Sequence, residues 1–379
     1  MDNKILIPKS RYTKALLPIS DSTTYFKNEQ FVRDYLTEVA NKFEEVNLVI
    51  AGTLKRHNEM TLENITEEEA INKLNISTIQ YKNFIRDRIK EIDPNKDSDK
   101  DSNKFSDKFN IYSWQEMIDF SGRESFENNL KILSEEFAKG ERFTEDISRM
   151  TENFLLLGNN PSKLKANGVS LEDAIKKNSQ YLIEESAGLL SIPCAFDKIT
   201  EIYPGTFGIQ EDLQKGKYGF ESKLNISNKR NFREAKEYSF GEASLKDATQ
   251  ILTIGTDKSE FGISKYFWDQ KQLENLITSD QDFVIVAKEK ENEEIKGFAI
   301  CSYHPPTGKA TFENAWVSKD DIKYGISSHL KKYVENFCSE IGAKFIVSMT
   351  EKSDSLAKRC LEKSGYKTAG VFNWNYKNL

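Results

Sequence analysis

The sequence predicts an α/β protein in which a domain with a parallel β-sheet precedes a smaller α+β domain. Its length of 379 residues is typical of two domains. Near the start, two apolar strands at 15–20 and 46–51 flank a helix at 28–45. A strand–helix–strand unit with short connections implies a parallel sheet. In the last third, strands at 283–287 and 297–303 are joined by a short polar turn, which is typical of an antiparallel hairpin.

Between these two patterns lies a polar segment of mixed charge, residues 229–238. Such composition is typical of a connection between domains. We therefore expect a first domain at 1–228, a linker at 229–238 and a second domain at 239–379.

Composition excludes several classes of protein. The net charge of −6 argues against a uniformly basic surface that coats nucleic acid, although a local basic patch remains compatible with it. No apolar run reaches transmembrane length, and the N-terminus lacks the pattern of a signal peptide. The four cysteines show no Cys-x-x-Cys spacing, which favours free thiols in a reducing compartment. We expect a cytoplasmic monomer with no membrane and no DNA partner.

In chain order, the first strand ends at Ser20 and the second is followed by the loop 52–57. Ligands of parallel sheets bind beyond the carboxyl ends of the strands, so both segments are candidates for a site. The three histidines, His57, His304 and His329, lie in separate elements, and no metal site is expected.

Thr66 and Glu69 form a capping box that opens the next helix. A further helix at 78–92 carries four cations, and such a run is either a solvated face or a patch that contacts phosphates. These cations are Lys82, Arg86, Arg88 and Lys90. Residues 93–108 follow as a polar surface loop whose acidic spacing mimics a calcium loop but lacks its glycine and closing glutamate.

After a short strand at 111–114 and helices at 125–139 and 144–157, a helix at 170–190 opens with Ser170 and carries Tyr181 and Glu185. Four residues apart, these two side chains lie on one face, one turn from each other. A phenol beside a carboxylate can hold and deprotonate an amine. The plainer alternative is a half-buried tyrosine beside a solvated glutamate.

The next strand begins at 199 and is ended by Pro204, which cannot donate to a β-ladder. Tyr203 is therefore presented at a strand end, as is Ser20.

Taken together, residues 14–225 resemble the tRNA-dependent cyclodipeptide synthases. The segment from Leu17 to Phe26 resembles the family's nucleophile segment, with Ser20 as the nucleophile. Tyr181 and Glu185 match its Tyr-x-x-x-Glu helix, and Tyr203-Pro204 matches the Tyr-Pro form of its late tyrosine motif. Pro18 replaces a glycine and Thr23 an asparagine. Thr23 with Tyr203-Pro204 fits the branch of the family that lacks this asparagine.

The resemblance implies a Rossmann-like sheet similar to the catalytic domain of class I aminoacyl-tRNA synthetases. It also implies an activity that joins amino acids from two aminoacyl-tRNAs into a diketopiperazine without a cofactor. Ser20 would form the aminoacyl-enzyme, Tyr181 and Glu185 would hold its ammonium group, and Tyr203 would assist proton transfer.

Beside these catalytic roles, the resemblance places three residues next to the substrate: Pro18, Thr23 and Pro204. The basic helix 78–92 would grip tRNA phosphates through Lys82, Arg86, Arg88 and Lys90, assisted by Lys55 and Arg56.

Residues 239–379 resemble the GNAT acetyltransferases. Gly325, Ile326 and Ser327 lie where that family binds the pyrophosphate of acetyl-CoA at a helix start, although Ile322 departs from the motif. Ser353 and Leu361 replace the Asn and Tyr of a later motif, so the general acid is missing. This domain is expected to acetylate the product with acetyl-CoA as cofactor, or to serve as a docking module without catalysis.

Two other functions remain open for the first domain. Ser20 could pass the amino acid to another small acceptor, or the chain could bind aminoacyl-tRNA without catalysis.

Overall fold

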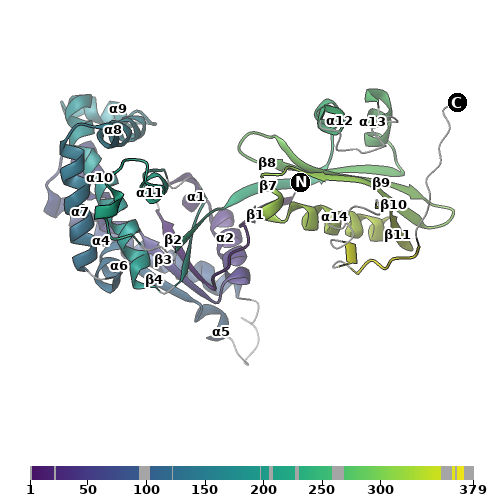
Figure 1. The fold of residues 1–379 in the computed structure, drawn as a ribbon, viewed down its shortest axis with the longest axis horizontal. Coiled ribbons are helices and arrows are strands. Elements are labelled where there is room, and N and C mark those ends of the chain that lie inside the picture. The colour runs from purple at the N-terminus through teal and green to yellow at the C-terminus, as the bar shows by residue number, and fades with distance from the viewer. Residues whose placement is uncertain are drawn as a thin grey trace. The chain divides into compact units, whose positions relative to one another are not determined.

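The computed structural model describes residues 2–20, 23–93, 103–121, 123–196, 198–204, 208–226, 230–257, 269–350, 361–362 and 365–370. The chain divides into two compact units. One is Ile5–Lys236, and the other is Glu237–Leu379 together with Met1–Lys4. Figure 1 shows their elements.

The N-terminal unit is built on five strands with helices between them. In chain order its principal elements are β2 (Lys14–Ile19), α1 (Thr24–Lys27), α2 (Glu29–Lys42), β3 (Glu45–Ile50), α3 (Arg56–Glu63), α4 (Glu67–Ile92), α5 (Asn103–Ser106), β4 (Phe109–Ser113), α6 (Trp114–Ser121), α7 (Arg123–Ala138), α8 (Arg142–Leu155), α9 (Asn160–Ala166), α10 (Leu171–Ser191), β5 (Ile199–Tyr203), α11 (Ile209–Gln214) and β6 (Arg230–Glu234).

The five strands of this unit form a parallel sheet in the order β4-β3-β2-β5-β6. The chain starts in the middle with β2, proceeds outward through β3 and β4, and returns to the other side of β2 as β5. The order therefore reverses between β2 and β5, which is the switch point where ligands bind in open parallel sheets.

Two apolar layers hold this sheet between helices (Figure 1). On one face, buried residues of β2 and β3 pack against α2 and α4, with Tyr35 and Leu36 among the most deeply buried. On the other face, Leu16 and Val49 pack with Trp114 of α6 and with the end of α10. The alternation of the strand residues between two apolar layers is the expected pattern for a strand covered on both faces.

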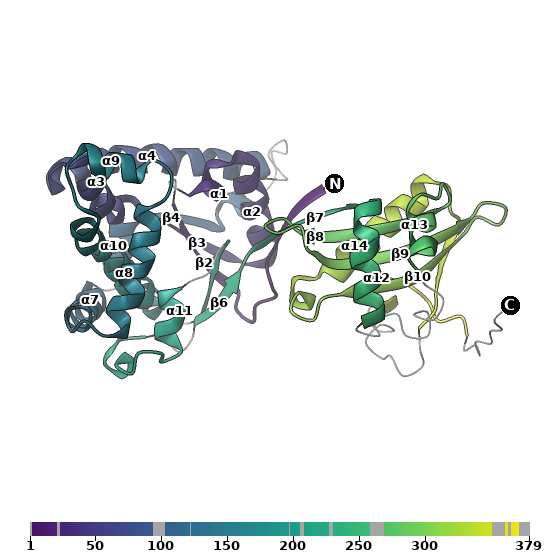
Figure 2. The same ribbon diagram turned by 90° about the horizontal axis from the view of Figure 1, so that it is seen from above.

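The C-terminal unit has a mixed sheet in the order β1-β7-β8-β9-β10-β11. Its elements are β1 (Asp2–Leu6), β7 (Lys236–Glu242), α12 (Ala248–Asp257), α13 (Gln270–Ile277), β8 (Asp282–Glu289), β9 (Ile295–His304), β10 (Lys309–Val317), α14 (Ile326–Glu340) and β11 (Phe345–Ser348). Helices α12 and α13 pack on one face of this sheet, and α14 contacts β8 and β9 (Figure 2).

The predicted fold class is confirmed by these two sheets, and the capping box at Thr66 and Glu69 is present. Several expected elements differ. Residues 67–92 form one continuous helix rather than two, and residues 24–27 form a short helix instead of a loop. The segment predicted as the linker contains β6, whose residues pair with β5, so the polar sequence belongs to an edge strand.

Near the C-terminus, Gly365 has a φ of +86°, as expected for a residue that ends a helix. The strand expected to start at Tyr366 is not formed by residues 366–370. Ser353 and most of the helix predicted at 353–364 lie outside the described residues. Cys301 and Cys338 are buried free thiols with their Sγ atoms 4.0 Å apart.

Candidate active site

The candidate site lies at the carboxyl ends of β2 and β5, on either side of the switch point. Ser20 directly follows β2, and Tyr203 is the last residue of β5. β2 pairs with β5 only through Ala15 and Leu16, so Pro18 lies beyond that ladder, where a missing N–H breaks no pairing with β5.

Thr23 holds the backbone of Ser20 by two hydrogen bonds. The backbone N–H and the hydroxyl of Thr23 both donate to the Ser20 carbonyl, at 3.2 and 3.0 Å. Helix α1 follows at once, and the ring of its Phe26 lies 6.4 Å from the ring of Tyr203. Helix α1 therefore contacts the end of β5. Thr23, expected beside the substrate, holds the backbone of Ser20 in this arrangement.

Helix α10 places the predicted pair of side chains in direct contact. Ser170 accepts a hydrogen bond from the backbone N–H of Asp173 at 3.1 Å and so caps the helix. Three turns later, the Tyr181 hydroxyl donates to Glu185 Oε1 at 3.1 Å. Gln210 of α11 donates to the other carboxylate oxygen, Oε2, at 3.4 Å. The hydrogen bond between Tyr181 and Glu185 confirms the expected contact along one helix face.

The surroundings of Glu185 make it a proton acceptor suited to neutral pH. Burial raises the pKa of Glu185 to about 7, although the hydrogen bonds from Tyr181 and Gln210 oppose the rise. Burial also raises the pKa of Tyr203 to about 12, with a further contribution from the nearby charge of Glu185. Tyr203 therefore stays protonated and can donate, while Glu185 exchanges its proton near pH 7.

Solved structures that resemble the chain fall into two sets. The first covers 62% of the chain and includes a cyclodipeptide synthase from Bacillus thermoamylovorans (14% identity, 96% of that chain, TM-score 0.46) and a cyclo(L-leucyl-L-phenylalanyl) synthase (15% identity, 99% of that chain, TM-score 0.45). The second covers 38% of the chain and includes a possible acetyltransferase from Clostridium difficile 630 (16% identity, 98% of that chain, TM-score 0.32). The sequence matches no family model and no curated protein.

The first set contains cyclodipeptide synthases, which residues 14–225 resemble in sequence. The second contains acetyltransferases, which residues 239–379 resemble. Neither set distinguishes the branch expected from Thr23 and Tyr203-Pro204.

The four cations of α4 divide into two pairs. Lys82 binds Glu116, and its side chain is 12% exposed. Arg88 is 17% exposed and binds Glu29 and Glu91. Both side chains are thus engaged within the protein. Glu91 lies three residues after Arg88 on the same helix, but Glu116 and Glu29 are distant in the sequence, so the helical pattern alone gave no sign of those two contacts.

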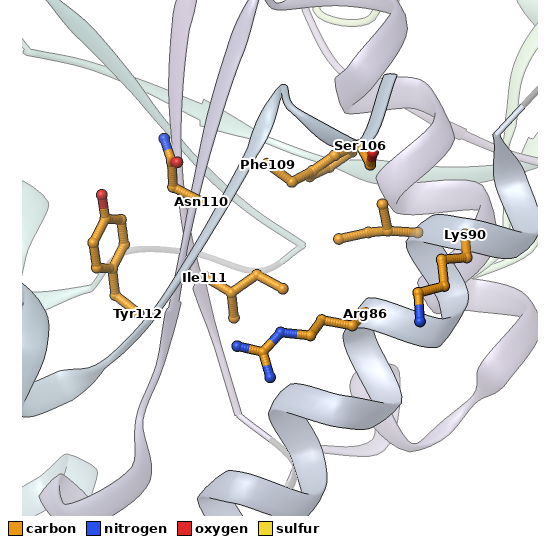
Figure 3. A pocket seen from close by; sticks show the side chains of 8 residues that line it. Arg86, Lys90, Ser106, Phe109, Asn110, Ile111 and Tyr112 are labelled. Carbon is orange, nitrogen blue, oxygen red and sulfur yellow. The ribbon is translucent and has the colours of Figure 1, made fainter. Parts of the chain in front are cut away.

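Arg86 and Lys90 form the other pair. Both are exposed and line a hollow of about 380 Å³ between α4 and the edge strand β4 (Figure 3). Ile89 of α4 and Phe109 and Ile111 of β4 contribute its apolar walls. Of the four predicted phosphate contacts, these two side chains are the ones that reach an open surface.

Arg56 and Glu184 form a charged contact that the sequence did not indicate. The Arg56 guanidinium donates to Glu184 Oε1 and Oε2 at 2.9 and 2.7 Å, and to Glu67 at 2.8 Å. Arg56, expected to assist in binding tRNA, is therefore occupied within the protein, and Lys55 is buried. His57 Nε2 lies 2.8 Å from Glu184 Oε2. Arg56 and His57 are more than 120 positions before Glu184 in the sequence, and no spacing rule connects them with it.

In the C-terminal unit, α14 begins directly after Gly325, which has a φ of +77°. Among the residues that the structure describes, no side chain caps this helix start, which leaves backbone N–H groups of its first turn to meet a ligand or water. Ile326 is buried, whereas Ser327 is exposed. Leu361 offers no proton where the resembling family has a tyrosine.

Within the described residues, no group of three or more His, Cys, Asp or Glu side chains is placed to hold a metal ion. No helix of the described part of the chain is long and apolar enough to cross a membrane.

Proposed function

We propose that the N-terminal unit joins two amino acids from aminoacyl-tRNAs into a cyclodipeptide through an aminoacyl-Ser20 intermediate. The observation that carries this proposal is the hydrogen-bonded pair Tyr181 and Glu185, whose carboxyl group has a pKa of about 7 and lies near Tyr203. An amine nucleophile needs a proton acceptor of this kind at neutral pH. The position of Ser20 at the switch point supports its role as the acyl acceptor.

In the first step, the Ser20 hydroxyl attacks the ester carbonyl of one aminoacyl-tRNA. The new ester bond to Ser20 forms as the bond to the terminal ribose of tRNA breaks, and the ribose oxygen takes up a proton. Tyr203 is the donor suited to that oxygen, because its raised pKa keeps it protonated, and the proton that leaves the Ser20 hydroxyl replaces the one that Tyr203 donates. Glu185 and Tyr181 hold the α-ammonium group of the captured amino acid.

In the second step, the amine of another aminoacyl-tRNA attacks the ester on Ser20 and forms a dipeptidyl-tRNA. The amine of the first residue then attacks the remaining ester, which closes the ring and releases tRNA. Glu185 already contacts this first amine and accepts its proton at ring closure. Because the substrates arrive as esters, the chemistry requires no ATP.

For tRNA itself, we propose that Arg86 and Lys90 contact backbone phosphates. Both are exposed on one face of α4, four residues apart. Their partners are exposed residues of the same helix: Lys90 lies 3.6 Å from Asp87, and Arg86 donates to Asn83 at 3.1 Å. Such contacts are independent of sequence and weaken steeply with salt.

Capture of the amino acid on Ser20 tests this proposal. Protein is incubated with an aminoacyl-tRNA that is radiolabelled in its amino acid and is then quenched in acid. Wild type should retain covalent label and Ser20→Ala should retain none. Ser134→Ala, a serine of α7 away from the strand ends, serves as the matched control and should label as wild type does. Covalent label on Ser20→Ala together with diketopiperazine would refute the assignment.

The same assay separates the alternatives. Labelled protein that yields no diketopiperazine, but passes the amino acid to another amine, indicates transfer to a different acceptor. Binding of tRNA without any label indicates a protein that binds aminoacyl-tRNA without catalysis.

For the C-terminal unit, we propose that acetyl-CoA binds at the start of α14, at Gly325, Ile326 and Ser327. The uncapped helix start supports a phosphate site there. Acetylation of the dipeptide product is the activity to test, and docking without catalysis is the other outcome, since Leu361 replaces the general acid. Acetyl-CoA should raise the thermal midpoint, and acetylated diketopiperazine would decide for catalysis. No thermal shift and no acetylated product would remove acetyl-CoA from the account.

A further inference from the structure

Strand β5 carries a buried carboxyl group that the proposed mechanism does not use. Glu201 lies two residues before Tyr203 and is fully buried. Glutamate is rarely buried to this extent without a partner or a function, because removing its carboxyl group from water is costly. Glu201 interacts with other residues of the protein, but a carboxylate offers about four acceptor positions and can bind a further donor. Its location decides which donor can reach it.

The side chain of Glu201 lies on the face of the sheet that packs against α10. Glu201 is paired with Leu16 in the ladder between β5 and β2, and paired residues of neighbouring strands share a face. Leu16 and Ile199 belong to the apolar layer against which Tyr181 packs. Because side chains alternate along a strand, Ile199, Glu201 and Tyr203 form one row on this face. Glu201 therefore lies about 7 Å deeper in the sheet than Tyr203.

A second buried polar group, the indole of Trp114, belongs to the same layer. It lies against α10 at Gly188, where a Cβ atom would be 2.3 Å from its six-membered ring. Gly188 is three residues after Glu185, so the indole meets the helix face that carries the candidate pair, one turn farther on. The indole is buried, and its Nε1 finds no acceptor among the described residues. A buried donor of this kind is normally satisfied by a ligand or an ordered water.

The amino acid captured on Ser20 is held at two points in the proposed function, by its ester and by its α-ammonium group at Tyr181 and Glu185. Its side chain is the remaining substituent, and the layer between the sheet and α10 lies directly below these residues. We propose that Glu201 and Trp114 form the base of the pocket for this side chain, and that the pocket selects amino acids whose side chains donate a hydrogen bond. This inference rests on the proposed function and names its substrate class.

The chemistry of the two groups narrows the class. A carboxyl group accepts hydrogen bonds, whereas an indole N–H only donates. An amide, hydroxyl or imidazole side chain can do both, by donating to Glu201 and accepting from Trp114. A hydrocarbon side chain of the same size would exclude water from the pocket and offer neither group a partner. Sites that hydrogen-bond their substrates reject analogues that lack the bonding group more strongly than apolar pockets discriminate by size.

A purely structural role for Glu201 predicts a different result. If its carboxyl group only holds β5 in the sheet, capture on Ser20 should depend on the size of the amino acid and not on its polarity. Replacing Glu201 would then change the capture of every amino acid by the same factor. The ratio of capture rates for two amino acids of similar shape separates the two roles, because a loss of folded protein cancels in that ratio.

The experiment measures formation of the aminoacyl-Ser20 ester by the full chain. One tRNA is charged separately with different amino acids, so that contacts with the tRNA stay the same. Asparagine and leucine form one pair of similar size, and glutamine and methionine form another. Wild type should capture the polar member of at least one pair about 10- to 100-fold faster than the apolar member.

The variants assign this preference to its residues. Glu201→Leu should lose or reverse the preference, and Trp114→Phe, which keeps an aromatic ring without the N–H, should weaken it. Glu136→Gln, at a buried glutamate of α7 that is bound to two lysines, is the matched control and should keep the wild-type ratio. Equal capture of both members of each pair by the wild type would overturn the inference, and so would an unchanged ratio in Glu201→Leu.

The product provides an independent check. A diketopiperazine made by the wild type should contain at least one residue whose side chain donates a hydrogen bond. A product with hydrocarbon side chains alone would overturn the inference and leave the proposed function intact. Wild-type protein that takes up no label from tRNA charged with any standard amino acid would instead refute the proposed function itself, which distinguishes the two failures.

Discussion

Replacing Glu185 with glutamine should abolish product and at the same time stabilise the protein at neutral and alkaline pH. The carboxyl group has a pKa of about 7 in the folded chain, against 4.5 when it is exposed. A raised pKa means that the folded state disfavours the ionised form. The penalty is absent below pH 4.5, grows as the pH rises, and is complete above about pH 7.

At 1.36 kcal/mol per pH unit, the rise from 4.5 to about 7 corresponds to about 3 kcal/mol. Glutamine has the same shape and no charge, so Glu185→Gln avoids this penalty. It loses part of the acceptor capacity offered to Tyr181 and Gln210, which reduces the expected gain to about 1–3 kcal/mol. For a unit of this size, that corresponds to a rise in thermal midpoint of about 2–10 °C.

The assay compares thermal midpoints of wild type and Glu185→Gln at pH 5 and pH 8, with diketopiperazine formation measured in parallel. The variant should be clearly more stable at pH 8, nearly equal at pH 5, and inactive at both. Wild-type activity should rise with pH through about 7, as the carboxylate forms. A stability difference that is the same at both pH values, or normal turnover by the variant, would refute the placement of Glu185 as a buried base.

Three further changes test other parts of the account. Tyr203→Phe removes the proton donor at the end of β5 and should lower the rate of product formation about 10²-fold while tRNA binding, measured by filter retention, is unchanged; an unchanged rate would exclude Tyr203 from proton transfer. Arg86→Ala should weaken tRNA binding and reduce its salt dependence by about one charge, whereas Lys131→Ala, an exposed lysine of α7, should have little effect; equal effects of the two would show that α4 has no special part. Gly188→Ala should destabilise the protein by about 1–3 kcal/mol, because the new methyl group would lie 2.3 Å from Trp114, and a thermal midpoint equal to that of wild type would contradict the close packing of α10 on α6.

Much of the N-terminal fold could be predicted from the sequence, because the patterns that indicate its strands and helices lie within short segments. The apolar strands β2 and β3 and the capped start of α10 are each visible within a few residues. Polar edge strands escaped prediction, since β6 contains a single apolar residue, Phe232, and resembles a linker. Helix α4 was predicted as two pieces, although Ala70, Leu74, Ile85 and Ile89 hold it to the core as one helix.

The candidate site also has one part that local sequence patterns predict and another part that depends on how distant elements pack. The contact between Tyr181 and Glu185 follows from helical spacing, and the placement of Ser20 and Tyr203 follows from strand ends. The partners of Glu184, and the occupation of Lys82 and Arg88 by distant carboxylates, depend on how separate elements pack. No periodicity within one segment contains that information. The raised pKa of Glu185 likewise depends on burial by neighbouring elements.

The central claim is that the chain converts aminoacyl-tRNAs into a cyclodipeptide by way of Ser20. Mass spectrometry of culture medium from a host expressing the chain tests it most directly, with Ser20→Ala and Ser134→Ala expressed in parallel. The account predicts a new diketopiperazine with the wild type and with Ser134→Ala, and none with Ser20→Ala. The same diketopiperazine from Ser20→Ala, or none from a folded wild-type protein, would contradict it.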